Sequence, residues 1–399
     1  MRNYLQIASV SLLGSAIPLL SVSRGLFFAA IIFSALLGLS SLKLSEIKQS
    51  IKNTFTPKFA ILTVPLLFVI AISAVQGIDF DYSMKKLTDL LIVFTSISLL
   101  SIFLNAMTKE KLELCLKVLS GTTLLSILLL CFDMFFASKE FLIAFHGEEN
   151  IGAGRVRYPA SQIAVVAPLV FGYLYHIKAK KLLSYLFIAF VFLIIMSTGG
   201  RSAQLSLIVG VGFMFIIMAI KSKKLNFKLL LAGVASFVIL LFAGVAGYKY
   251  VDYRSGGSEF ERRMTAGSQD LSSGRFDIWK FTWEESLKKP FLGIGVGGYR
   301  ALTADPELVL PAKNHPHNFV LEVLISTGFI GLLVVGLVLL YLFISYFTYS
   351  TGFGVFAMGS FVVFWVNSLT SVSIIQTYWI ALFAVSFVIG YFMMKKEKN

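Results

Sequence analysis

Cysteine and histidine are scarce in this chain. Its 399 residues include two cysteines and four histidines. Cys115 and Cys131 lie inside one apolar run, which argues against a disulfide framework and leaves the redox compartment open. They are expected to be small buried residues. Few histidines and no cysteine pattern also argue against a zinc site.

Charged residues are few as well, and acidic ones are the fewest. Only 14% of the residues are charged, 57% are hydrophobic, and the mean hydropathy is +0.82. This balance is typical of a polytopic membrane protein. The net charge of +14 could indicate nucleic-acid binding. However, the lysines and arginines stand in short clusters between apolar runs, where they set topology and contact lipid headgroups. We expect membrane lipids as partners, and no nucleic acid.

Long apolar runs are what the chain has in abundance. Crossing about 30 Å of hydrocarbon takes roughly 20 apolar residues. The first run resembles a signal peptide but is followed by apolar helices throughout, so it is interpreted as a span. We therefore predict an all-α polytopic membrane protein with about twelve transmembrane helices, at 6–22, 25–42, 59–76, 87–104, 112–136, 158–177, 182–198, 202–220, 228–247, 318–345, 352–372 and 377–394.

The distribution of lysine predicts the orientation. Lysines cluster at 43–58, 109–111, 178–181, 221–228 and 395–398, all on one side of the predicted spans. Positive loops stay in the cytoplasm, so both termini are expected there. Residues 1–247 then hold spans one to nine, residues 248–316 form a large periplasmic loop, and residues 317–399 hold spans ten to twelve and a short cytoplasmic tail.

The large loop is too long for a simple connector. Ser272 or Ser273 can cap a helix that ends near Pro290. One face of this amphipathic helix holds Phe276, Trp279, Trp283 and Leu287. We expect it to lie at the membrane interface or against the bundle, seated by its two tryptophans. The next residues, F-L-G-I-G-V-G-G-Y-R, permit tight turns. They lack the flanking strand and helix of a dinucleotide site.

Arginines near the outer boundary are candidates for anion binding. Arg201 follows a Gly-Gly break and begins the eighth span, where Ser202 and the helix N-terminus could help to hold a phosphate. The alternative is an interfacial arginine that contacts headgroups. Arg275 opens the amphipathic helix, where a cation opposes the helix dipole, so it is expected to have another partner. Arg155 and Arg157 could extend a basic vestibule or bind headgroups.

His317 is the strongest candidate for a general acid or base, because imidazole titrates near neutral pH and the residue stands where the loop enters the tenth span. Asn318 could orient it or the substrate. His315 precedes it by two residues and could share its role. Glu322 is interpreted as an internal hydrogen-bond partner. Asp79 and Asp81 could hold a divalent cation, although a solvated loop is the simpler interpretation.

Three motifs together resemble the O-antigen ligase family, within the superfamily of membrane glycan ligases and polymerases. They are S-T-G-G-R-S-A at 197–203, G-R-x-x-x-W with K-P-F-L-G-I-G-V-G at 274–297, and H-N with S-T-G-F-I-G at 317–331. The resemblance implies a GT-C-like fold. It also implies transfer of O-antigen polysaccharide from undecaprenyl pyrophosphate to a sugar hydroxyl of lipid A-core, at the periplasmic face of a Gram-negative inner membrane.

The same resemblance implies roles for particular residues. Arg201 and Arg275 match the arginines that bind the pyrophosphate, and His317 matches the histidine that activates the acceptor. The family reaction is regarded as metal-independent and inverting, with no cofactor. An O-antigen polymerase or a protein O-oligosaccharyltransferase would use a similar donor and remains an alternative. A lipid-linked oligosaccharide flippase would also have twelve spans and a basic cavity, but its ionisable residues would lie near the membrane midplane.

Overall fold

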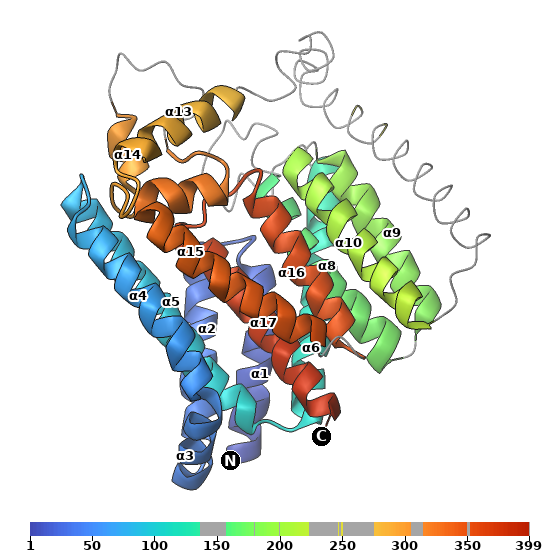
Figure 1. Ribbon diagram of the computed structural model, residues 1–399. Coiled ribbons are helices and arrows are strands. Elements are labelled where there is room, and N and C mark those ends of the chain that lie inside the picture. The colour runs from blue at the N-terminus through green and yellow to red at the C-terminus, as the bar shows by residue number, and fades with distance from the viewer. Residues whose placement is uncertain are drawn as a thin grey trace.

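The computed structural model describes residues 1–135, 157–222 except 179 and 199, 246, 249, 275–304, 314–348 and 352–398. Within these ranges all regular structure is helical (Figure 1). In chain order the elements are α1 (Arg2–Leu19), α2 (Arg24–Ser40), α3 (Leu44–Thr54), α4 (Pro57–Val75), α5 (Phe80–Ala106), α6 (Lys109–Phe135), α8 (Arg157–Gly172), η1 (Tyr173–Ile177), α9 (Lys181–Ser197), α10 (Arg201–Ser222), α13 (Arg275–Lys288), α14 (Gly298–Leu302), α15 (Phe319–Thr348), α16 (Gly354–Ser368) and α17 (Thr377–Lys398).

The helices agree with the predicted class of fold. In the described part of the chain, seven helices are long and apolar enough to cross a membrane, and α2, α9 and α16 are shorter apolar helices. The predicted ninth run, 228–247, falls almost entirely outside the described residues, and every other predicted run falls on a helix. The chain is a polytopic helical membrane protein. The total of twelve spans and a GT-C-like layout stay predictions.

One helix lies deep inside the bundle. In α8 with η1, 78% of the most apolar stretch is buried, against 17% in α4. Helix α8 packs against α16, α9 and α10, and α16 also packs along α10. Gly210 permits the close approach of α10 and α16, because a Cβ there would lie 3.0 Å from the Gly359 carbonyl oxygen. Small residues at helix interfaces let backbones approach in this way.

The two ends of the bundle differ in character. Figure 1 shows both termini and α3 at one end, and α13 and α14 at the other, which we call the outer end. The end with the termini carries the lysine-rich segments, where Lys178 pairs with Glu113 at 3.3 Å and Lys395 donates to Asn105 at 3.1 Å. This asymmetry is what the lysine distribution in the sequence predicts.

A glycine-rich turn attaches α13 and α14 to the bundle. Gly293, Gly295 and Gly297 all have positive φ, at 69°, 103° and 81°. The turn pairs with α15: Ile294 N donates to Ile325 O at 2.8 Å and Gly295 N donates to Ser326 O at 3.1 Å. The G-I-G-V-G run therefore fixes the loop to the tenth predicted span through backbone hydrogen bonds.

Helix α15 is interrupted where the turn meets it. Gly328 has φ 66° and ψ −170°, a conformation outside the helical region. The interruption frees backbone groups that the turn then satisfies, since Phe329 N donates to Pro290 O at 2.7 Å and Ser73 Oγ of α4 donates to Ser326 O at 2.6 Å. The glycine-rich turn around Gly295 and the interrupted part of α15 around Gly328 therefore contact each other directly.

The face by which α13 docks differs from the predicted one. Its buried residues are Ile278, Thr282 and Ser286. Trp279 is half-buried and contributes to the docking, but Trp283 is exposed. Trp283 lies at the edge of the docking face, where it meets the Phe329 ring of α15 with 6.3 Å between centroids. The centre of that face is Ile278, which is buried with Ile294, Tyr299 and Ile325. The Ser272 and Ser273 caps lie outside the described residues.

Candidate active site

A strained turn carries the two histidines at the outer end, directly before α15. His317 has φ 53°, the only positive φ at a non-glycine residue among the described residues. Its backbone N–H donates to His315 Nδ1 at 3.2 Å, and the two rings lie 4.0 Å apart between centroids. Trp279 Nε1 of α13 donates to Pro316 O at 3.1 Å. The His315 ring and Trp279 of α13 thus both hold the turn in place. A non-glycine residue kept at positive φ commonly marks a functional position.

The hydrogen bonds assign different tautomers to the two imidazoles. His317 Nδ1 lies 2.8 Å from Ser371 O. A carbonyl oxygen only accepts, so Nδ1 carries the proton and Nε2 keeps its lone pair when the ring is neutral. His315 Nδ1 instead accepts the His317 N–H. Its own proton is therefore on Nε2, and that nitrogen offers no lone pair. Only His317 presents a basic nitrogen that the turn itself does not use.

Burial keeps both histidines neutral. Burial, together with the neighbouring His317, lowers the pKa of His315 to about 3. The pKa of His317 is lowered by burial, raised by the Ser371 carbonyl and lowered by the charge of Arg275. A neutral imidazole at physiological pH is the form that can accept a proton. Arg275 is thus near enough for its charge to act on His317.

The residues after His317 have structural partners. Asn318 Oδ1 accepts the backbone N–H groups of Val320 and Leu321 at 3.0 and 3.3 Å, which caps α15. The Asn318 side-chain oxygen therefore already accepts two hydrogen bonds from the helix backbone. The buried Glu322 accepts from Ser373 Oγ at 2.5 Å and from Ile374 N at 2.7 Å. The interpretation of Glu322 as an internal hydrogen-bond partner is confirmed.

The connection between α16 and α17, residues 369–376, joins the separate parts of the site. Ser202 Oγ at the start of α10 donates to Thr370 O at 3.1 Å. The next residue, Ser371, accepts from His317, and Ser373 donates to Glu322. Arg201 is the neighbour of Ser202 and opens α10. One short segment therefore brings the Arg201 turn and His317 to the same place.

Other predicted site residues are placed as follows. Arg201 is exposed and Arg275 is half-buried. Each of them interacts with other groups of the protein. Arg157 begins α8, but its side chain is outside the described residues, as is all of Arg155. Gly200 N–H donates to Thr198 Oγ1 at 3.3 Å, so this amide of the Gly-Gly break already has a partner.

Sequence reasoning missed the 369–376 connection. Residues 369–372 fall at the end of the eleventh predicted span and 373–376 fall between it and the twelfth, although the run S-L-T-S-V-S at 368–373 is polar for a membrane helix. That polarity was the available signal.

Asp79 was considered as a metal ligand. Its Oδ1 accepts a hydrogen bond from the Tyr82 N–H at 3.1 Å and caps α5. No group of three or more metal-ligating side chains occurs within the residues that the structure describes.

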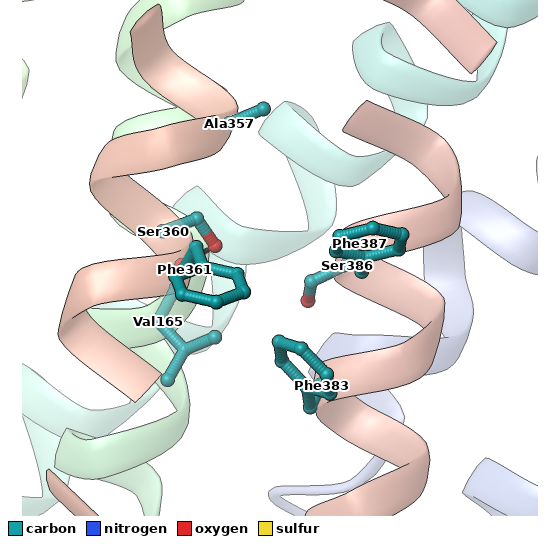
Figure 2. A pocket seen from close by; sticks show the side chains of 7 residues that line it. All are labelled: Val165, Ala357, Ser360, Phe361, Phe383, Ser386 and Phe387. Atoms are coloured by element: carbon teal, nitrogen blue, oxygen red, sulfur yellow. Dashed lines mark hydrogen bonds between the residues drawn. The ribbon is translucent and has the colours of Figure 1, made fainter. Parts of the chain in front are cut away.

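A small cavity lies away from this site. It is enclosed by α8, α16 and α17, with Ser360 and Ser386 among aromatic rings (Figure 2). Its volume of about 10 Å³ leaves room for at most one water molecule. It is too small to hold a sugar, so the candidate site remains the polar cluster at the outer end.

Comparison with known proteins agrees with the motifs. Residues 185–336 match the family described as O-antigen ligase. This segment includes Arg201, Arg275 and both histidines of the turn. A Rickettsia conorii protein named as a candidate polysaccharide ligase is 24% identical over 182 residues. The aligned part covers 43% of this chain and 42% of that relative, less than half of its length. The expected family resemblance is confirmed.

Proposed function

Because residues 185–336 match the O-antigen ligase family, we propose that the chain ligates a polysaccharide at the outer end of its bundle. The donor is a glycan linked to undecaprenyl pyrophosphate, and the acceptor is a sugar hydroxyl of lipid A-core. The acceptor oxygen attacks the anomeric carbon, the bond from that carbon to the pyrophosphate breaks, and the hydroxyl proton passes to His317 Nε2. Undecaprenyl pyrophosphate leaves with the bonding electrons.

The observation that carries this proposal is the state of the His317 ring. Its Nδ1 proton is directed at Ser371 O, 2.8 Å away, which holds the ring and leaves the Nε2 lone pair for the acceptor. Burial and Arg275 lower its pKa, so the ring is in the basic, neutral form. His315 is bound to the turn through Nδ1. The tautomers therefore favour His317 as the base, with His315 as the residue that shapes the turn.

The arginines supply the complementary charge. A pyrophosphate leaving group gains negative charge as its bond to the sugar breaks, and preorganised cations lower the barrier most when they are aimed at that charge. Arg275 acts electrostatically on His317. Arg201 adjoins Ser202, which is bound to the same connection as His317. In this arrangement leaving group and acceptor meet between the two arginines and the imidazole. No metal is needed for this step.

The test is transfer from undecaprenyl-pyrophosphate glycan to purified lipid A-core by the protein in liposomes, with and without chelator. We expect His317→Ala to lose at least ~100-fold in kcat, the usual contribution of a general base. His315→Ala should lose less and should mainly lower thermal stability. An active His317→Ala protein beside an inactive His315→Ala protein would reverse the assignment, and loss of activity with chelator would contradict metal independence.

Glycan analysis of cells separates the ligase from its nearest alternative. Deletion of a ligase should leave finished polymer on the lipid carrier. Deletion of a polymerase should instead leave single repeat units on lipid A-core, and that outcome would replace the ligase with the polymerase.

A further inference from the structure

Helix α13 presents a row of large apolar side chains that the protein does not cover. Phe276 is 69% exposed, Leu287 is 49% exposed and Trp283 is 45% exposed. At 3.6 residues per turn these three positions lie within about 40° of each other around the helix. Phe291, in the turn that follows α13, is 70% exposed. Soluble surfaces rarely expose a continuous patch of this kind unless something binds it.

The row is continuous with the surface that α15 turns to the membrane. Trp283 meets the Phe329 ring edge-on, with 6.3 Å between centroids. Phe329, Ile330 and Leu333 are exposed on α15, which is one of the helices long and apolar enough to cross a membrane. The Phe291 carbonyl accepts from Ile330 N at 3.3 Å. The two apolar surfaces therefore adjoin at the point where α15 is interrupted.

Polar residues border the row on one side only. Asp277 and Glu284 are exposed and follow Phe276 and Trp283 by one residue each, which places them about 100° around the helix. Lys280 and Lys288 are also exposed. Long lysine stems can lie along acyl chains while the ammonium group reaches lipid phosphates. The helix thus has a buried face toward α15, an apolar face and a charged face.

We propose that α13 lies in the outer boundary between lipid headgroups and acyl chains. Phe276, Trp283, Leu287 and Phe291 insert among the acyl chains, and the lysines at the edges contact headgroup phosphates. A helix with separate apolar and charged faces binds a lipid surface in this way. The occupant of the row is the bilayer that already surrounds α15. The part of the loop that carries α13 therefore belongs to the interface and does not stand in the periplasm.

This placement has a consequence that rests on the proposed function. Arg275 is the first residue of α13, so an interfacial helix holds it at the depth of lipid phosphates. The pyrophosphate of a lipid-linked donor lies at that same depth. The donor can then reach Arg275 by lateral diffusion within the leaflet.

Spin-label accessibility tests the placement in the full-length protein. In a Cys115→Ala, Cys131→Ala background reconstituted in liposomes, single cysteines replace Phe276 or Leu287, with Asp277 or Glu284 as matched controls on the charged face. The measurement is collision with oxygen, which concentrates in acyl chains, against collision with a water-soluble nickel chelate. We expect the oxygen-to-nickel ratio to be severalfold higher at 276 and 287 than at 277 and 284.

Two results would overturn the proposal. High nickel accessibility at all four positions would place α13 in water. Protection of 276 and 287 from both reagents would show that protein covers the row. Thermal unfolding of each labelled protein identifies misfolded variants, and a second label at Phe291 replaces any that fail. Glycan transfer is measured separately, so an inactive protein with the expected accessibility would contradict the proposed function and leave the interfacial placement intact.

Discussion

His317 and Arg275 illustrate how charge is arranged at the scale of single residues. The positive guanidinium lowers the pKa of the imidazole, as burial does. A lowered pKa keeps the ring neutral to lower pH, so the base remains available at and below neutrality. Removing the positive charge should move that pKa back up, and the base should be lost at a higher pH.

The Arg275→Gln variant tests this coupling. We expect the pKa of His317 to rise, because the positive charge that disfavours the imidazolium is removed. Carbon-13 labelled histidine makes the titration measurable by NMR, because the chain has only four histidines. Arg275→Lys keeps the charge and should leave the titration nearly unchanged. An unchanged His317 pKa in Arg275→Gln would contradict the coupling.

Glu322 is expected to position His317 indirectly, through the connection between α16 and α17. Its carboxylate accepts from Ser373 Oγ and Ile374 N, and the same connection offers the Ser371 carbonyl to His317. We expect Glu322→Ala to lower kcat by about tenfold with a small change in donor KM, because leaving buried hydrogen-bonding groups without a partner costs ~1–3 kcal/mol. Glu322→Gln, which keeps one acceptor oxygen, should restore part of the loss. Equal effects on kcat and KM would argue against positioning.

At the scale of elements, backbone conformation decides how the loop docks. Gly328 interrupts α15 with φ 66°, and a Cβ there would overlap the backbone of Phe291. The interruption exposes carbonyls that the glycine-rich turn uses, as in the bond from Gly295 N to Ser326 O. The position of α13, and with it Arg275, therefore depends on two glycines.

Alanine substitutions at two glycines of α15 distinguish the docking role of Gly328 from the general effect of glycine on helix stability. Gly328→Ala should destabilise the protein by ~1–3 kcal/mol, because its backbone region is nearly closed to other residues. The turn should also detach and glycan transfer should fall. Gly336→Ala, in the same helix with no atom within 4 Å of the added Cβ, should leave stability unchanged or raise it. Thermal unfolding in detergent measures both, and equal stability of the two variants would contradict the docking role.

At the scale of the whole molecule, the bundle separates a lysine-rich end with both termini from an outer end with the candidate site. Figure 1 shows this division. The positive-inside rule predicts that the lysine-rich end is cytoplasmic. On that prediction the candidate base and the arginines lie on the opposite side, where the proposed lipid-linked donor would be presented.

Cysteine labelling measures this orientation. In the Cys115→Ala, Cys131→Ala background, we expect Asp81→Cys to react with an impermeant maleimide in spheroplasts. Lys52→Cys should react only after permeabilisation. Both positions are exposed. Lys52 is in α3, at the end with the termini (Figure 1), whereas Asp81 follows Ile78, whose N–H donates to Ile294 O in the turn at the outer end. The reverse pattern would place the candidate site in the cytoplasm and would exclude the proposed periplasmic reaction.

Sequence alone determined the class of fold, the two-ended charge pattern and the family resemblance, because apolar length, lysine distribution and short motifs are local properties of the chain. It also singled out Arg201, Arg275 and His317. Tertiary structure decided what joins them. The 369–376 connection, distant in sequence from all three, supplies the Thr370 and Ser371 carbonyls that meet Ser202 and His317. Only folding could place these partners, because each hydrogen bond joins segments that are 54 to 168 residues apart. The docking face of α13 was likewise decided by packing, in which Ile278 is buried with Ile294, Tyr299 and Ile325 while the larger apolar side chains Phe276, Trp283 and Leu287 stay exposed.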